Sequence, residues 1–396
     1  MPSDRRIKIL FVTSCLDTGG AEMFLWQLLG ELDRDRFVPT VVSLRDRGTL
    51  GDTIEALGVR VHTLNLRGNV RGALSMLDLP RLMRKLRPDL IQGWMYHGNL
   101  AAIYARVPAR LDTPVLWSIH HSIQDLAREK RTTRWLIKHS RWAAKAVSAI
   151  QYCSIASKNQ HEALGYPPQL SVAIPNGFDC ERFRPCPERR DQLRNDLGVP
   201  SNAKVIGHIA RYHPMKDHAN FIRAAACYAS SETRARFVLA GRGVDESNAE
   251  LVKLRADLGL QDRMFFLGEH DDTPILFQAF DLCSSSSAYG EAFPLVVGEA
   301  MASGVPCVVT DVGDSALIVG DTGLTVPARD HDALAAGWRA LLDESAESRT
   351  WRCRAARARI LEHFTLTAAA NQFADLYQRL HRSDTRSISA RTSPVS

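Results

Sequence analysis

Short apolar runs rich in β-branched residues alternate with amphipathic stretches along nearly the whole chain, and this alternation is the strongest constraint on its fold. It predicts parallel strands joined by crossover helices, which is the pattern of the α/β class. We expect a first set of strands at residues 7–14, 38–44, 59–64, 90–94 and 115–119. A second set is expected at residues 204–210, 236–240, 264–267, 281–284 and 305–310.

The chain of 396 residues exceeds the usual size of a single hydrophobic core, so two domains are expected. Residues 175–200 carry four prolines among charged residues and form the best candidate for a linker. We place the domains at 1–187 and 188–363, followed by a helix at 364–382. Residues 383–396 are rich in Ser, Thr and Arg with few bulky apolar side chains, which predicts a disordered tail.

The composition is that of an ordinary globular protein, with 45% hydrophobic and 24% charged residues. The eight cysteines form no C-x-x-C pair and no His/Cys cluster with the spacing of zinc ligands, which favours reduced thiols. No apolar run reaches the ~18 to 20 residues that cross a bilayer, and the N-terminus lacks the core of a signal peptide. We therefore expect a cytoplasmic protein.

The segment EAFPLVVGE, from Glu291 to Glu299, places a carboxylate at each end of an apolar run. Pro294 suits the first turn of a helix, and Gly304 is placed to close that helix in a left-handed conformation. Leu295 and Val296 would then present free backbone N–H groups at the positive end of the helix, where anions bind readily. A carboxylate beside an anion site usually accepts hydrogen bonds from hydroxyl groups, so the arrangement suits a sugar joined to a phosphate. The plainer interpretation is a capped core helix.

The surrounding sequence, residues 284–327, reads SSSSAYGEAFPLVVGEAMASGVPCVVTDVGDSALIVGDTGLTVP. It resembles the donor-site signature of the family 4 retaining glycosyltransferases, and the resemblance extends from the TGGAE loop at Thr18 to a helix ending near His381. The resemblance implies the GT-B fold, an α/β architecture of two doubly wound Rossmann-like domains that face each other across a cleft. Residues 1–187 would then form the acceptor side, residues 188–363 would bind the nucleotide sugar, and the last helix would cross back onto the first domain.

Two basic residues, Arg211 and Lys216, follow the strand predicted at 204–210, and strand carboxyl ends face the ligand crevice in such sheets. A nucleoside diphosphate leaving group gains negative charge as the glycosidic bond breaks, and fixed cations can stabilise that charge. The family has Arg and Lys in the same loop, which implies that they hold the phosphates; the alternative is a pair of solvated loop charges. No Asp-x-Asp sequence of the metal-dependent transferases stands at a strand end, and the Arg/Lys pair makes a metal unnecessary. We expect neither a metal nor another cofactor.

Gly19 and Gly20 lie between the first strand and a helix, where glycine lets the backbone approach an anion closely. The resemblance implies that this loop meets the donor phosphate. It also implies that His120 helps to orient the donor sugar, and His97 could shape the acceptor side. The alternative for both histidines is a structural role.

By the same resemblance, Glu291 would contact the transferred sugar and Glu299 the ribose of the nucleotide. A carboxylate accepts two hydrogen bonds at once, which suits vicinal hydroxyls. Family members retain the anomeric configuration, and the leaving phosphate takes the acceptor proton. Asp311 and Gly313 are expected to shape a loop beneath the sugar rather than to bind a cation.

The segment from Arg128 to Lys145 carries seven basic residues against one acidic residue, and the difference of +6 equals the formal charge of the whole chain. One helical stripe comprises Arg134, Lys138, Arg141 and Lys145. Trp135 and Trp142 lie on the adjoining stripe. Basic residues that border tryptophans suit a helix resting on an anionic membrane, and the alternative is a solvated face with the tryptophans in the core.

Together these features predict a retaining, metal-independent hexosyltransferase with a UDP- or GDP-sugar donor and a glycan or lipid-linked acceptor, working in cell-surface polysaccharide synthesis. Two alternatives stay open. One is an enzyme like the UDP-N-acetylglucosamine 2-epimerases, which share the fold, and the other is a nucleotide-sugar-binding protein without catalysis. No nucleic-acid module is recognisable, so nucleic acid is not expected as a partner.

Overall fold

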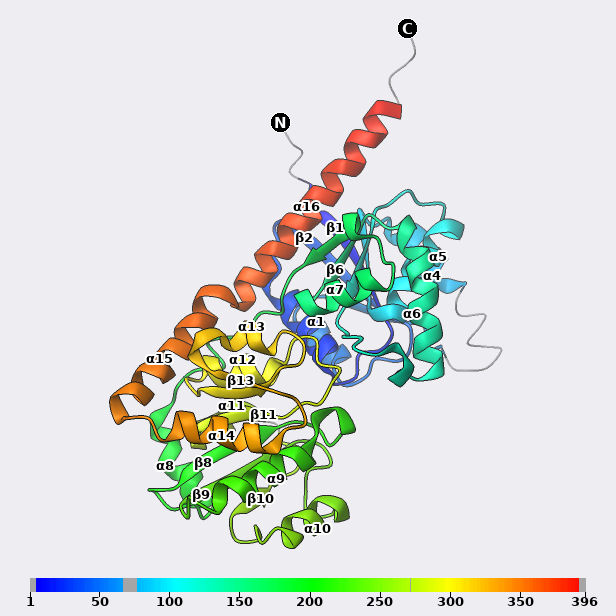
Figure 1. The fold of residues 1–396 in the computed structure, drawn as a ribbon. Helices are drawn as coiled ribbons and strands as arrows, with labels where there is room; N and C mark the ends of the chain where they lie inside the picture. Colours follow the sequence, from blue (N-terminus) through cyan, green and yellow to red (C-terminus); the bar gives the residue numbers. More distant parts are fainter. Residues whose placement is uncertain (1–4, 67–76, 271, 392–396) are drawn as a thin grey trace. The chain divides into compact units, whose positions relative to one another are not determined.

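The computed structural model describes residues 5–66, 77–270 and 272–391, which form two compact units (Figure 1). The first unit contains the chain up to Gly177 together with the segment from Leu366 onward, and the second unit is Phe178–Thr365. Each unit is built on one fully parallel sheet with helices packed against it. This confirms the predicted α/β class and the doubly wound architecture.

The sheet of the first unit has seven strands in the order β3-β2-β1-β4-β5-β6-β7. Their bounds are β1 Ile7–Thr13, β2 Phe37–Ser43, β3 Arg60–Thr63, β4 Leu90–Trp94, β5 Val115–Ile119, β6 Ala149–Tyr152 and β7 Ser171–Ala173. The five predicted strands are present within one or two residues. The sequence analysis missed β6 and β7 because they are short and lack a run of β-branched residues.

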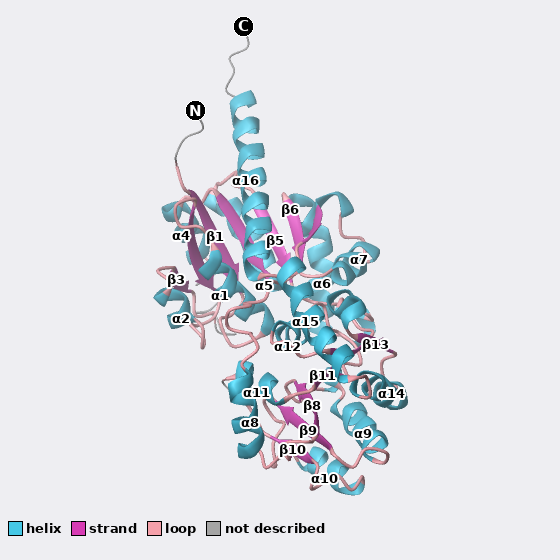
Figure 2. Cartoon of the chain, turned by 90° about the vertical axis from the view of Figure 1, so that its left-hand side faces the viewer, coloured by secondary structure: helices cyan, strands magenta, loops and turns pink. Residues whose placement is uncertain are grey.

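Helices cover both faces of this sheet, as expected when a parallel sheet is buried on its two sides. One face carries α1 (Gly20–Glu31) and α16 (Leu366–Arg391), and the other face carries α4 (Asp78–Leu86), α5 (Met95–Ala109) and α6 (Arg131–Ala143). Figure 2 shows α16 lying along the strands of this unit. The remaining helices of the unit are α2 (Gly51–Ala56) and α7 (Ile155–Ala163).

The last helix, α16, is anchored by apolar packing and by one buried polar contact. Phe373 packs against Phe24 of α1, and both side chains are fully buried. The hydroxyl of Tyr377 donates a hydrogen bond of 2.6 Å to the side-chain oxygen of Gln92 in β4. The segment after the second unit is therefore part of the core of the first unit.

The sheet of the second unit has six strands in the order β10-β9-β8-β11-β12-β13. Their bounds are β8 Lys204–Ile209, β9 Ala235–Ala240, β10 Met264–Phe266, β11 Leu282–Ser285, β12 Cys307–Thr310 and β13 Leu324–Val326. Buried Phe221, Tyr228 and Trp338 pack α9 (His218–Ala229) and α14 (His331–Leu342) against it. The other helices are α8 (Pro187–Asp196), α10 (Ala249–Asp257), α11 (Thr273–Ala279), α12 (Leu295–Ala302), α13 (Ser315–Val319) and α15 (Ala346–His363).

The structure differs from the sequence analysis at two segments. The proline-rich stretch 175–200 is not a free linker, because the second unit begins at Phe178 and α8 forms within the stretch. The division therefore falls at 177/178 instead of 187/188. The helix α16 also continues to Arg391, where a disordered tail was expected from residue 383; residues 392–396 lie outside the described chain.

Candidate functional site

The strand order of each sheet reverses at one point, between β1 and β4 in the first unit and between β8 and β11 in the second. In open α/β sheets, ligands bind outside the carboxyl ends of the strands at such a point. Most of the residues predicted to bind substrate follow these strands: Gly19 and Gly20 follow β1, His97 follows β4, Arg211 and Lys216 follow β8, and Glu291 follows β11. His120 follows β5, the neighbour of β4. Topology thus places them where a ligand site is expected.

In the second unit, Lys216 and Glu291 form an ion pair between the loops after β8 and β11. The Lys216 ammonium donates to Oε1 of Glu291, and only 8% of Glu291 is exposed. The buried hydroxyl of Ser287 donates to the same oxygen over 2.9 Å. Within the described residues, Oε2 of Glu291 accepts no hydrogen bond, which leaves one oxygen able to receive a sugar hydroxyl.

The loop after β12 supports the backbone that carries Glu291. Gly313 has φ of +63°, and a Cβ atom there would lie 2.3 Å from the carbonyl oxygen of Glu291. The N–H of Asp314 donates to the carbonyl of Ala292 over 3.0 Å. Gly313 therefore permits a close approach that any side chain would block, as predicted for a loop-shaping role.

The helix α12 begins at Leu295, and Pro294 is its N-cap rather than its first residue. The N–H groups of Leu295 and Val296 donate no backbone hydrogen bond within the described part of the chain, and both residues are partly exposed. They provide the positive helix end that the sequence analysis expected. Gly304 has φ of +78° just beyond the helix, so the predicted left-handed termination is also present.

Glu299 lies in α12 one turn beyond these free N–H groups. Burial raises the pKa of its carboxyl to about 7, and the nearby charge of Arg182 opposes this shift. The carboxyl therefore titrates near neutral pH. Arg211, by contrast, is exposed, and its side chain forms no ion pair with another described residue.

In the first unit, Gly20 is the first residue of α1 and Gly19 is its extended N-cap. A Cβ atom on Gly19 would lie 2.5 Å from a carboxylate oxygen of Glu22, at the flexible end of that side chain. Burial raises the pKa of the Glu22 carboxyl. The sequence analysis did not assign Glu22, although it belongs to the TGGAE loop.

His120 stacks on the buried Trp94, with ring centroids 4.5 Å apart. The indole N–H of Trp94 in turn donates to the carbonyl of Ala21, which ties His120 to the glycine loop. Burial lowers the pKa of His120 to about 3, so the ring is neutral. Neither ring nitrogen has a hydrogen-bond partner of good geometry among the described residues. His97 lies exposed in the first turn of α5.

Ser287 is a site residue that sequence reasoning missed, since a serine in a run of four carries no distinctive signal. The structure singles it out because its hydroxyl is buried and bound to Glu291. Thr310 of β12 fixes the same segment by donating to the carbonyl of Ser287 over 2.7 Å.

Comparison with known proteins agrees with this geometry. Residues 18–182 match the model of "Glycosyltransferase Family 4", and residues 189–358 match that of "Glycosyl transferases group 1". The lipopolysaccharide core biosynthesis mannosyltransferase LpsB of Rhizobium meliloti is 30% identical over 65% of this chain and 71% of its own length. A UDP-Gal:alpha-D-GlcNAc-diphosphoundecaprenol alpha-1,3-galactosyltransferase of Escherichia coli is 25% identical over 83% of this chain and 84% of its own.

A solved structure of Anabaena HepE in complex with UDP-glucose superposes with a TM-score of 0.82 and 25% identity. The alignment covers 94% of this chain and all (100%) of that one. The two sheets, the residues at their switch points and these matches define a glycosyltransferase of the GT-B fold, an enzyme that transfers hexosyl groups in glycan biosynthesis. The chain belongs to the family 4 glycosyltransferases.

Proposed function

We propose that the protein transfers a hexosyl residue from a UDP-sugar or GDP-sugar to a glycan or lipid-linked acceptor, with retention and without a metal, in cell-surface polysaccharide synthesis. One observation carries the proposal: Lys216, Glu291 and the open end of α12 gather at the switch point of one sheet. UDP is favoured as the nucleotide because UDP and UDP-glucose are bound in solved structures of Anabaena HepE.

The proposed chemistry divides the site into a cationic part and a carbohydrate part. Arg211, Lys216 and the N–H groups of α12 would hold the diphosphate and stabilise the charge that develops when the glycosidic bond breaks. Oε2 of Glu291 would accept a hydrogen bond from a hydroxyl of the transferred sugar. The departing phosphate would take the proton of the acceptor hydroxyl as the new bond forms on the same face of the sugar.

Retention and metal independence are tested together by incubating the purified chain with UDP-hexoses and extracts of lipid-linked glycans, with EDTA present. We expect turnover that depends on acceptor and continues in EDTA, with the anomeric configuration of the product unchanged by NMR. Turnover of the donor without any acceptor would instead support an epimerase or hydrolase. Loss of activity in EDTA that Mg²⁺ or Mn²⁺ restores would refute the metal-independent mechanism.

The titration of Glu299 provides a second test. An ionised carboxylate can accept hydrogen bonds from both ribose hydroxyls, whereas a protonated carboxyl offers fewer acceptor sites. Because the pKa of Glu299 is raised to about 7, we expect UDP affinity to increase as the pH rises from 6 to 8, by up to about tenfold per unit below the pKa. Calorimetric titration with UDP at several pH values measures this.

The terminal phosphate of UDP also titrates, with a pKa of about 6, so its own pH dependence must be separated from that of Glu299. Comparison with Glu299→Gln achieves this. The variant keeps the size of the side chain but cannot ionise, and its UDP affinity should lose the additional pH dependence. Equal pH profiles for the two proteins would rule out a ribose contact by Glu299.

We also propose that the first unit docks on an anionic membrane surface through α6, from the cytoplasmic side. In α6 the tryptophans do not lie in the core, since 61% of Trp135 and 76% of Trp142 are exposed. The buried side of this helix is formed by Ile137 and Ser140 instead. The tryptophans of α6 are therefore outside the core, which supports the docking proposal.

The exposed aromatic surface extends beyond α6. Trp135 stacks on His139 with ring centroids 5.0 Å apart, and His139 bonds the hydroxyl of Tyr104 in α5 over 2.6 Å. Exposed Lys138 and Lys145 border this surface. Amphipathic aromatic rings flanked by basic residues match the boundary between lipid headgroups and acyl chains, where each basic residue contributes about 1 kcal/mol. Within the described residues no helix is long and apolar enough to span a membrane.

Sedimentation with vesicles containing phosphatidylglycerol tests the docking. We expect binding at low salt that weakens as salt increases. The double substitution of Trp135 and Trp142 by Ala should abolish most of it. Trp351→Ala is the matched control because Trp351 is 60% exposed but lies in α15 of the second unit. A wild-type protein that stays in the supernatant at low salt would defeat the proposal.

A further inference from the structure

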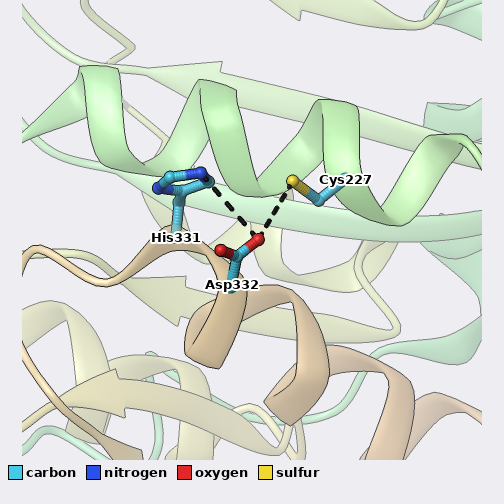
Figure 3. A group of neighbouring side chains, drawn as sticks. All are labelled: Cys227, His331 and Asp332. Atoms are coloured by element: carbon cyan, nitrogen blue, oxygen red, sulfur yellow. Dashed lines mark hydrogen bonds and ion pairs between the residues drawn. The ribbon is translucent and has the colours of Figure 1, made fainter.

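Three potential metal ligands from two helices meet in the second unit, apart from the residues proposed to bind the donor. Cys227 belongs to α9, and His331 and Asp332 are the first residues of α14. Figure 3 shows the three side chains pointing toward one another across the contact of these helices. Their nearest ligand atoms all lie within 4.8 Å of each other, and among the described residues they alone form such a group.

The ligand atoms of this cluster lie close to the spacing found in a metal site. The thiol sulfur of Cys227 lies 3.5 Å from Oδ1 of Asp332, and Nε2 of His331 lies 3.9 Å from the same oxygen. In a tetrahedral zinc site with bonds of ~2.3 Å to sulfur and ~2.0 to 2.1 Å to oxygen and nitrogen, neighbouring ligand atoms are separated by roughly 3.3 to 3.6 Å. The separation of Cys227 from Asp332 falls within this range, and the imidazole of His331 must move closer to Asp332 when an ion binds.

The chemistry of the three ligands narrows the choice of metal. A thiolate selects soft or borderline cations, and the combination of sulfur, imidazole and carboxylate is typical of zinc rather than of magnesium or calcium. A thiolate and a carboxylate also balance the two positive charges of the ion. The side chains are partly or fully exposed, so an ion can enter from solvent and a water molecule can fill the fourth position.

A hydrogen bond between a thiol and a carboxylate is the simpler alternative, and the chain contains such a pair for comparison. The sulfur of Cys186 donates to the carboxylate of Glu188 over 3.1 Å, but no third ligand joins this pair among the described residues. The cluster at α9 and α14 differs from it by the imidazole of His331.

We propose that Cys227, His331 and Asp332 bind a thiophilic divalent cation, best matched by Zn²⁺, and that the bound ion ties α9 to α14. On binding, the thiol of Cys227 loses its proton to solvent and the sulfur forms a bond to the metal. These helices already pack together through Phe221 and Trp338 in the core. An ion that binds only the folded cluster therefore stabilises the second unit by mass action. The sequence hides this site because Cys227 and His331 lie far apart in the chain.

Metal titration of the full chain tests the proposal. The metal-free protein is titrated with ZnCl₂ against a chromophoric chelator, and with CoCl₂ while the thiolate-to-metal charge-transfer absorption is recorded. We expect one ion per chain, a charge-transfer band with Co²⁺, and a higher melting temperature with Zn²⁺. Since loss of outer-shell partners alone costs about 10- to 100-fold in affinity, Cys227→Ser should weaken binding by at least that factor.

Two further variants and one control separate this site from adventitious binding to other thiols. His331→Ala and Asp332→Asn should each weaken zinc binding and leave the melting temperature of the metal-free protein unchanged. Cys186→Ser should bind zinc like the wild type. Binding that Cys227→Ser leaves intact, a Co²⁺ complex without the charge-transfer band, or no binding at a several-fold excess of zinc would each overturn the proposal.

Discussion

Replacing Lys216 by Ala is expected to lower kcat by roughly 10²- to 10³-fold, the usual cost of removing one fixed donor that stabilises charge in a transition state. The ammonium is held in place by Glu291 beside the open end of α12, so it can meet a departing diphosphate without reorganisation. Steady-state kinetics with a UDP-sugar and an acceptor measure the effect. Donor affinity should change much less than kcat, because the charge develops during bond cleavage.

A lysine outside the site provides the matched control for this substitution. Lys253 pairs with Asp257 on the surface of α10, where both side chains are mostly exposed. Lys253→Ala should leave kcat unchanged. If Lys216→Ala has the same kcat as Lys253→Ala, then Lys216 does not contribute to catalysis.

The pairing of Lys216 with Glu291 also predicts a non-additive result. Glu291→Gln removes the negative charge that positions the Lys216 ammonium, and it weakens the proposed contact with the sugar. Lys216→Ala removes the ammonium itself, so either single variant already disrupts the arrangement that the two side chains share. The double variant should therefore lose much less activity than the product of the two single losses, as is common for groups in one network. Fully additive losses would show that the two side chains act independently.

The second large effect is on stability, and it concerns a charged residue that the sequence analysis placed in a linker. Only 3% of Arg194 in α8 is exposed. Its guanidinium donates to the carbonyls of Ala279 and Ala203 over 2.9 to 3.1 Å and to Oδ2 of Asp281 over 2.7 Å. The same carboxylate oxygen accepts from the backbone N–H of Val205, at the start of the β8 region.

Arg194→Ala is expected to reduce the free energy of unfolding by about 2 to 4 kcal/mol, because it leaves the buried carbonyls of Ala279 and Ala203 without their donor. Asp281 keeps Arg190 and the backbone N–H of Val205 as partners, so its charge stays compensated. Urea denaturation followed by circular dichroism measures the change. Lys253→Ala removes an exposed pair and should cost less than about 1 kcal/mol. If the two variants unfold at the same urea concentration, then the buried pair does not hold α8 on the second unit.

Much of the proposed donor site was predictable from the sequence. The start of α12, its left-handed end at Gly304 and the loop-shaping role of Gly313 follow from local chemistry, since glycine and proline restrict or free the backbone wherever they occur. The strands that precede Lys216 and Glu291 were also predicted, because a parallel strand that is buried on both faces forms a short, largely apolar run in the sequence.

Other features depend on contacts between residues that are distant in the chain. The partnership of Lys216 with Glu291 and Ser287, the stacking of His120 on Trp94, and the burial of Arg194 all join separate loops or helices. Arg194 lies in the stretch 175–200, where four prolines among charged residues predicted a linker. This pattern does not reveal that Arg194 forms an ion pair with Asp281, which lies almost ninety positions further along the chain.

The sequence by itself determined the class of fold, the succession of its principal strands along the chain and the positions of the loops proposed to bind the donor, because periodicity, glycine and proline act over a few neighbouring residues. Only the tertiary structure decided which charged groups are paired, which tryptophans of α6 face outward, and which residues of α9 and α14 meet. These outcomes depend on how elements pack, and packing is set by the whole sheet and its covering helices rather than by any local pattern.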